Sequence, residues 1–168
     1  MNHTVTFTVR RAVPEDALAI LEAHRAAIRG SSAETAYSRE VIEGWAPLHI
    51  PPERVEGFAR VIEQGGEVVL VAEDQAGQVM AFGSIVPRNS ELRAVYVNSA
   101  YARKGIGRAI LEQLEELARE AGMTELRMDA SINAQAFYEA SGFISLERAE
   151  HVAQSGLRMA CIRMRKSL

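Results

Sequence analysis

Residues 98–122 read NSAYARKGIGRAILEQLEELAREAG, and they predict a helix whose charges run in an unusual order. Apolar residues at helical spacing predict one face packed on a sheet, and they are Ile106, Ile110, Leu114, Leu117 and Ala121. A helix N-terminus carries partial positive charge and favours acidic side chains, whereas the C-terminal end favours basic ones. Here the basic residues come before the acidic ones: Arg103, Lys104 and Arg108, then Glu112, Glu115, Glu116 and Glu120. The helix is expected to end at Gly122.

The cations and the glycines among them indicate an anion-binding loop at the start of this helix. Each exposed cation near a helix N-terminus costs about 0.3–1 kcal/mol, so a bound anion explains the cluster better than a solvated surface does. Gly105 and Gly107 allow the backbone to approach a ligand closely and to direct N–H groups at it. Free N–H groups at Ile106 and its neighbours, the helix dipole and the basic side chains together predict a phosphate site.

Two other nucleotide-binding motifs fit this stretch less well. A Walker A loop would require G-x-x-x-x-G-K-[ST], which the sequence lacks. A Rossmann fingerprint would read GIGRAI, with Asp129 as the ribose partner. The third glycine position of that fingerprint holds Ile110, the loop is long, and the neighbouring strands look antiparallel.

The composition predicts one globular domain over residues 1–168. The chain is 48% hydrophobic and 24% charged, with a net charge of -3, so it has no overall attraction for nucleic acid or an anionic membrane. The single cysteine, Cys161, lies in the apolar run LRMACIRM and is expected to be buried. Neither a metal nor a disulfide is expected. No targeting segment or membrane span is recognised, so a cytoplasmic protein is expected.

The hydrophobic periods predict an α+β fold, in which helices flank a mixed central sheet. Period-two or continuous apolar runs predict strands over residues 4–9, 67–74, 78–88, 91–98, 124–131, 143–151 and 156–166. Helical spacing and capping residues predict helices over 14–30, 38–47, 52–66 and 133–142, besides the helix described above. One parallel strand–helix–strand unit is expected around that helix, within an otherwise antiparallel sheet.

The segment Glu91–Phe143 resembles the core of the GNAT superfamily of acetyl-CoA-dependent N-acetyltransferases. It contains ELRAVYVNSAYARKGIGRAIL and, downstream, NAQAFYEASGF, in the order and spacing of that superfamily. The resemblance implies the GNAT-like acyl-CoA N-acyltransferase fold. Ala102 departs from the family pattern, which usually has Gln or Arg at this position of the loop.

The resemblance implies that acetyl-CoA is the co-substrate. Its pyrophosphate would bind the Arg103–Arg108 loop, and its pantetheine arm would run along AVYV, bonded to the backbone of Tyr96 and Val97. Asn133 matches the family residue that contacts this arm. Phe137 is expected to pack close to the arm.

For catalysis, the resemblance implies that Tyr138 donates a proton to the leaving sulfur. Glu91 matches a position at which some members have a catalytic Glu, whereas many others use a chain of water molecules. The histidines His24, His49 and His151 are expected at the surface, and His3 at the terminus.

Tyr37 and Trp45 lie on a segment that would flank the acceptor cleft, where two aromatic walls would suit a small amine, and the simpler explanation for both is core packing. The predicted activity is transfer of an acetyl group from acetyl-CoA to the primary amine of a small molecule. The amine attacks the thioester directly. The alternative is a non-catalytic acyl-CoA-binding sensor module. Transfer to aminoacyl-tRNA would call for a basic surface, which the net charge does not indicate. A homodimer is compatible with the superfamily, but no residue indicates one.

Overall fold

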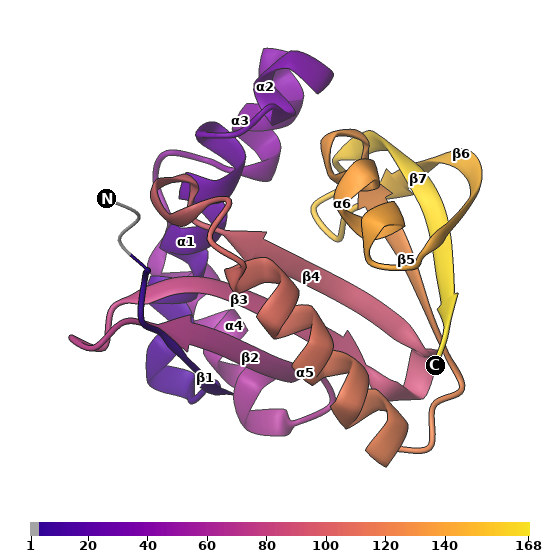
Figure 1. Ribbon diagram of the computed structural model, residues 1–168. Coiled ribbons are helices and arrows are strands. Elements are labelled where there is room, and N and C mark those ends of the chain that lie inside the picture. The colour runs from indigo at the N-terminus through magenta and orange to yellow at the C-terminus, as the bar shows by residue number, and fades with distance from the viewer. Residues whose placement is uncertain (1–3) are drawn as a thin grey trace.

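The computed structural model describes residues 4–168, and in this range seven strands form one mixed sheet (Figure 1). The sheet order is β1-β2-β3-β4-β5-β7-β6, and β4–β5 is its parallel pair. The strands are β1 (Thr8–Arg11), β2 (Val68–Glu73), β3 (Val79–Val86), β4 (Glu91–Val97), β5 (Glu125–Ser131), β6 (Ile144–Val152) and β7 (Arg158–Ser167). The helices are α1 (Ala17–Arg29), α2 (Ala33–Ala36), α3 (Arg39–Trp45), α4 (Pro52–Gln64), α5 (Ile106–Glu120) and α6 (Gln135–Ala140). The predicted α+β class and the parallel β4-α5-β5 unit are confirmed.

Helices cover both faces of the sheet, with α5 on one face and α1 and α4 on the other (Figure 1). Successive residues of β2 alternate between the two layers. Leu70 and Ala72 pack in the cluster that contains α5, whereas Val69 and Val71 pack in the cluster that contains α1 and α4. Burial on both faces explains why β2 and β3 read as continuous apolar runs.

The local signals for helix ends are confirmed, but the buried face of α5 is rotated from the prediction. The Ser38 hydroxyl accepts a hydrogen bond from the Val41 N–H at 3.3 Å, which caps α3. Gly122 adopts φ +79° directly after α5. On α5, Leu111 and Ala118 are buried, whereas Ala121 is exposed, so the predicted continuation of the face through Ala121 was wrong.

The strands β4 and β5 are joined at one end and then diverge. Their register contains the single pair Glu91↔Arg127 within the described chain, supported by a 2.8 Å hydrogen bond from the Arg127 N–H to the Ser90 carbonyl. β4 also contains a bulge, because its pairing with β3 passes from Ala94 to Leu92 and leaves Arg93 outside the ladder. The divergence separates β1–β4 from the curled unit of β5, α6, β6 and β7 (Figure 1).

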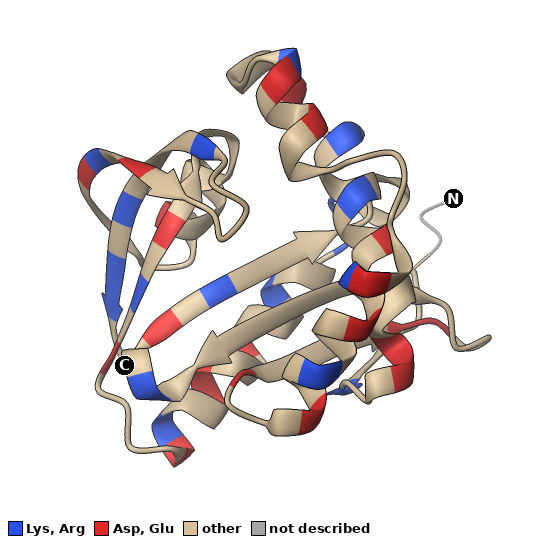
Figure 2. Ribbon diagram, turned by 180° about the vertical axis from the view of Figure 1, so that it is seen from behind, with Lys and Arg blue, Asp and Glu red and all other residues tan. Residues whose placement is uncertain are grey.

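Charged residues of both signs are distributed over the whole ribbon, and a run of basic residues lies on β7 (Figure 2). Many are ion-paired across strands, as in Arg163 with Glu147 at 2.8 Å. No helix within residues 4–168 has both the length and the apolar character needed to cross a bilayer.

Candidate active site

The loop before α5 presents a row of free backbone donors. Arg103 and Gly105 both have positive φ, +63° and +80°, which turns the chain sharply into the helix. The first bond of the helix runs from the Ala109 N–H to the Gly105 carbonyl at 3.1 Å. In the described chain, the N–H groups of Ile106, Gly107 and Arg108 therefore have no acceptor. Such a row, at the positive end of a helix dipole, is suited to an anionic ligand.

Part of the reversed charge order is compensated within the chain. Arg108 pairs with Glu112 at 2.9 Å, and both side chains are exposed. Glu115 is only 6% exposed and accepts a hydrogen bond from the Lys166 ammonium at 2.6 Å, so it belongs to an internal ion pair. Arg103 and Lys104 are exposed and have no ion-pair partner among residues 4–168. Of the three basic residues around the start of α5, Arg103 and Lys104 can therefore bind a ligand without breaking an ion pair of the described chain.

Gly107 has a packing role in addition to its free N–H group. A Cβ atom at this position would lie 3.2 Å from Val97 Cγ2 and 3.6 Å from Phe137 Cζ. The glycine thus lets the start of α5 approach β4 and α6 closely. Phe137, which is 36% exposed, lies beside this junction.

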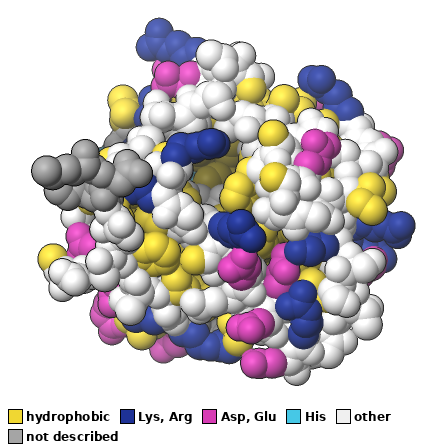
Figure 3. All heavy atoms as spheres, in the orientation of Figure 1, with side chains coloured by type: hydrophobic (Ala, Val, Ile, Leu, Met, Phe, Trp, Pro, Cys, Tyr) yellow, Lys and Arg dark blue, Asp and Glu magenta, His cyan; other side chains and the backbone are white. Residues whose placement is uncertain are grey.

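A small cavity of about 150 Å³ lies where β4 and β5 diverge. Its lining includes the backbone segment 95–97 of β4, together with Asn133 and Tyr138 from the segment after β5. The Asn133 Oδ1 atom is buried and has no hydrogen-bond partner. An unpaired buried acceptor costs about 1–3 kcal/mol, so this atom is suited to receive a donor from a ligand. On the face where α5 begins, the surface shows a hollow with hydrophobic side chains inside and basic side chains at its rim (Figure 3).

Tyr138 presents a protonated phenol to this cavity. The residue is 4% exposed, and its ring packs edge-on against Phe137 and Phe143 at centroid distances of 5.0 and 5.5 Å. No hydrogen bond within the described chain occupies its hydroxyl. Burial raises the pKa of Tyr138 well above its usual range, so the hydroxyl keeps its proton at neutral pH. The side chain can therefore act as a proton donor but not as a base.

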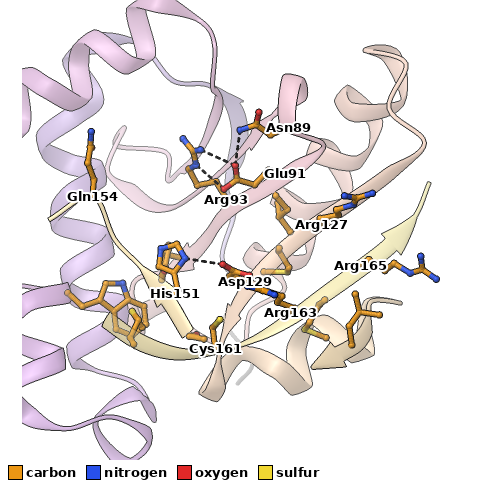
Figure 4. Close-up of a pocket in the computed structure, with 18 residues that line it drawn as sticks. Asn89, Glu91, Arg93, Arg127, Asp129, His151, Gln154, Cys161, Arg163 and Arg165 are labelled. Atoms are coloured by element: carbon orange, nitrogen blue, oxygen red, sulfur yellow. Dashed lines mark hydrogen bonds and ion pairs between the residues drawn. The ribbon is translucent and has the colours of Figure 1, made fainter. Parts of the chain in front are cut away.

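A larger cleft of about 950 Å³ lies next to the small cavity, between β4 and the β5–β7 unit (Figure 4). Trp45, Tyr96, Asp129 and Ser131 line both spaces, so the two adjoin each other. Cys161 also lines the cleft and is 2% exposed, which confirms its predicted burial. Burial raises the pKa of its thiol.

Glu91 lines this larger cleft, at the end where β4 meets β5 (Figure 4). Its carboxylate accepts hydrogen bonds from Arg93 Nη2 at 2.9 Å and Nε at 3.2 Å. Arg93 also binds Glu67 at 3.1 Å. Glu91 and Tyr96 are five residues apart on β4, which corresponds to about 16 Å of extended strand. The predicted base is therefore held in an ion-pair network at the closed end of the divergence.

The two aromatic residues expected to flank the acceptor cleft occupy different places. Trp45 lines both spaces and meets Tyr96 edge-on at 6.2 Å. Tyr37 lines neither space; it is 9% exposed, donates a hydrogen bond to the Ala160 carbonyl at 2.6 Å and accepts one from the Ile132 N–H at 2.8 Å. Its hydroxyl thus ties α2 to β7 and to the start of the α6 segment.

The histidines differ in environment, and His24 is half-buried rather than exposed as expected. This ring lies against Tyr96 at 4.7 Å and Trp45 at 6.2 Å, and burial, assisted by the nearby charge of Arg54, lowers its pKa to about 3. It is neutral at pH 7. His49 is exposed, as expected, and His3 lies outside the described residues.

His151 is a functional candidate that its sequence position does not reveal. It is exposed, as expected, but it lines the large cleft, with Nδ1 3.1 Å from Asp129 Oδ2 (Figure 4). The two residues are 22 positions apart in the chain. They meet because the curled β6–β7 hairpin pairs with β5 through β7, and no local pattern predicts that arrangement (Figure 1).

A mixed sheet whose parallel strands diverge around a cavity, next to a helix with free N-terminal amides, defines the architecture of the acyl-CoA-dependent N-acyltransferases. Residues 33–168 match the family described as acetyltransferase (GNAT) domain. The chain therefore belongs to the GNAT acetyltransferase family, and the resemblance found in the sequence is confirmed.

The names of two curated relatives describe acetyltransferases of amino groups. The chain is 30% identical over 100 residues to a probable glucosamine 6-phosphate N-acetyltransferase 2 of Oryza sativa subsp. japonica, a match that covers 52% of this chain and 60% of the relative. It is 26% identical over 91 residues to a thialysine N-epsilon-acetyltransferase of Caenorhabditis elegans, covering 51% and 57% of the respective chains. The chain thus spans about six-tenths of the length of each relative.

Solved structures match over nearly the full length. A GCN5-related N-acetyltransferase from Rhodopseudomonas palustris superposes with a TM-score of 0.83 at 28% identity, covering 100% of this chain and 99% of the other. The PaiA N-acetyltransferase of Thermoplasma acidophilum, solved with coenzyme A, gives a TM-score of 0.75 at 21% identity, with 97% and 99% coverage. The YncA protein of Salmonella typhimurium, solved with acetyl-CoA, gives a TM-score of 0.69 at 22% identity, with 96% and 94% coverage.

Proposed function

We propose that this protein transfers an acetyl group from acetyl-CoA to the primary amine of a small molecule, by direct attack of the amine on the thioester. The observation that carries the proposal is the pair of adjoining spaces between β4 and the β5–β7 unit. One contains the Tyr138 phenol and the unpaired Asn133 acceptor, and the other opens as a cleft beyond Trp45. Two reactants can thus meet within the divergence from different sides.

The residues around the small cavity fit the parts of acetyl-CoA. The N–H groups of Ile106, Gly107 and Arg108, with the side chains of Arg103 and Lys104, would bind the pyrophosphate. The backbone of Tyr96 and Val97 would bond the pantetheine arm as an added strand, Asn133 Oδ1 would accept an amide N–H from it, and Phe137 would pack beside it. Since these contacts are largely made by the backbone, Ala102 at the usual Gln or Arg position does not remove the site.

Acetyl-CoA supplies an activated acyl group, and the protein supplies positioning and proton transfer. Tyr138 donates a proton to the leaving sulfur, a role that its buried, protonated state supports. A backbone N–H at the end of β4 stabilises the developing oxyanion. Glu91 occupies the position at which some family members have a catalytic Glu, but its carboxylate is bound by Arg93 at the far end of β4, so the deprotonation of the amine falls to another group of the cleft.

The large cleft would receive the acceptor. Its walls combine the indole of Trp45 with the polar residues Glu91, Asp129, His151 and Gln154, which suits a small polar amine with an apolar part. The names of both curated relatives describe transfer to an amino group, which supports the reaction type.

A two-part experiment tests this proposal. Acetyl-CoA at millimolar concentration should raise the melting temperature by mass action, and NAD or ATP should raise it less. A screen that follows release of the CoA thiol, over an amine panel including glucosamine 6-phosphate, thialysine and phenethylamine, should identify acceptors. Absence of a thermal shift would contradict the cofactor site. A shift without thiol release for any amine would favour the sensor module.

A further inference from the structure

The pair formed by His151 and Asp129 has the geometry of an oriented base. His151 Nδ1 lies 3.1 Å from Asp129 Oδ2. An ionised carboxylate oxygen can only accept, so the proton of a neutral imidazole must be on Nδ1 in this contact. The lone pair is then on Nε2, the nitrogen that the contact leaves free.

Asp129 is itself held in place from the other side. The Arg163 Nε atom lies 3.8 Å from Asp129 Oδ1, and Arg163 Nη1 binds Glu147 at 2.8 Å. Asp129 and Arg163 face each other in the β5–β7 register, and Arg163 and Glu147 do so in the β6–β7 register. Asp129, Arg163 and Glu147 thus form a row across β5, β7 and β6. The row orients the Asp129 carboxylate toward His151.

The pair lies at the junction of the two reactant spaces. Asp129 lines both the small cavity, which contains Tyr138, and the large cleft, which His151 lines. The side chains of His151 and Asp129 are 47% and 36% exposed, so a polar acceptor and water can reach them. The other charged groups that line the cleft are Glu91 and Arg93 from β4, which bind each other, and the arginines of β5 and β7, which are Arg127, Arg163 and Arg165.

We infer that His151 is the catalytic base that takes the proton from the acceptor ammonium, and that Asp129 is its positioning residue. The inference rests on the proposed function and names the group that performs one of its steps. His151 Nε2 removes one proton from R–NH₃⁺, and the resulting amine forms the C–N bond as the C–S bond breaks. The Tyr138 proton passes to the sulfur, and the second amine proton restores Tyr138 through water. The imidazolium releases its proton to solvent, so the net products are the amide, CoA thiol and one H⁺.

Pairs of isosteric acceptors test this role. Each alkylamine that the protein acetylates is compared with the alkoxyamine in which oxygen replaces the carbon next to nitrogen, beginning with phenethylamine and O-benzylhydroxylamine. The alkylamine is an ammonium ion at pH 7, whereas the alkoxyamine is already neutral and needs no deprotonation before attack. His151→Gln should lower kcat/KM for the alkylamine by about 100-fold or more and change that for the alkoxyamine by less than about 3-fold. Asp129→Asn should lower the alkylamine value by about 10-fold.

Controls separate this inference from the proposed function. His49→Gln, at an exposed histidine outside the cleft, should change neither acceptor. Acetyl-CoA should raise the melting temperature of all variants equally. Equal losses on both acceptors in His151→Gln, or retained activity with the alkylamine, would overturn the inference while leaving the enzyme intact. A wild-type protein that acetylates no amine would contradict the proposed function itself.

A spectroscopic measurement tests the geometry without any acceptor. Imidazole ¹⁵N–¹H correlation spectra at neutral pH, with His151 assigned by its loss in His151→Gln, should show His151 as the Nδ1–H tautomer. Asp129→Asn should remove that preference, because the charged acceptor is gone. An Nε2–H tautomer in the wild-type protein would overturn the assigned base.

Discussion

Glu91 and Arg127 form the register pair at which β4 and β5 are joined, and within the described chain the pairing of these strands ends there. Everything proposed for this protein depends on that interruption. A continued ladder would fill the space between the strands with backbone hydrogen bonds. Because it stops, backbone groups of residues 95–97 and the side chains of Asn133 and Tyr138 face a cavity.

Loss of the Tyr138 hydroxyl should slow turnover without weakening the binding of acetyl-CoA. We expect Tyr138→Phe to lower kcat by at least about 10-fold, because the leaving sulfur would lose its proton donor. The measurement is steady-state thiol release together with the acetyl-CoA thermal shift. Tyr101→Phe is the matched control, since that hydroxyl makes only a 3.4 Å contact with Gln78. Unchanged turnover in Tyr138→Phe would remove this residue from the mechanism.

The cations without ion-pair partners should contribute to cofactor binding. Replacing Arg103 and Lys104 together by alanine should weaken acetyl-CoA binding by about 10-fold, an effect that added salt reduces in the wild type. Isothermal titration at two salt concentrations measures it. Arg39→Ala, at a side chain that is 92% exposed and outside both spaces, should leave the affinity unchanged. Equal affinities in all three proteins would exclude a charge contribution from the loop.

Two glycine substitutions should change stability in opposite directions. Gly105→Ala should reduce the free energy of unfolding by about 1–2 kcal/mol, since Gly105 has φ +80°. Gly57→Ala should increase it by about 0.5–1 kcal/mol, because this glycine lies inside α4 with open space around it. Urea unfolding of both variants provides the comparison. A lower free energy of unfolding in Gly57→Ala would contradict this prediction, because it would mean that α4 does not accept a side chain at position 57.

The Tyr37 hydroxyl should be important for stability. Tyr37→Phe leaves the Ala160 carbonyl and the Ile132 N–H without their partner, which should cost about 1–3 kcal/mol in urea unfolding. Phenylalanine keeps the ring packed against Trp45, so the loss isolates the hydrogen bonds. If Tyr37 instead contacts the acceptor, the variant would raise KM for the amine at unchanged stability.

The lowered pKa of the half-buried His24 should make the protein less stable in acid. Its folded-state pKa of about 3 lies below the unfolded value near 6.5, so the unfolded state binds more protons between these values. The free energy of unfolding should therefore fall as the pH drops below about 6.5, by at most about 1.4 kcal/mol per pH unit from this group. Urea unfolding at a series of pH values measures the slope. His24→Gln should flatten it, whereas His49→Gln should not.

Local patterns were sufficient for most of the fold. The caps at Ser38 and Gly122 and the apolar runs of β2 and β3 act within a few residues of their own position. The sequence therefore determined the order of the strands and of the longer helices and, through the α5 loop and the segment after β5, the family. It did not predict the short helix α2, and it placed the first strand at residues 4–9 instead of Thr8–Arg11. The exception within α5 is its buried face, because the angle at which a helix meets a sheet depends on packing partners such as Gly83, whose missing Cβ admits Ile110.

The tertiary structure alone decided how distant residues combine. It paired Glu115 with Lys166, placed the half-buried His24 among aromatic rings, and used the Tyr37 hydroxyl as a link between segments. It also brought His151 next to Asp129 through the curl of the β6–β7 hairpin. Helix caps and loop glycines are local features that a sequence displays directly. Proton transfer and burial depend on distances across the fold, and the sequence by itself contains no local record of them.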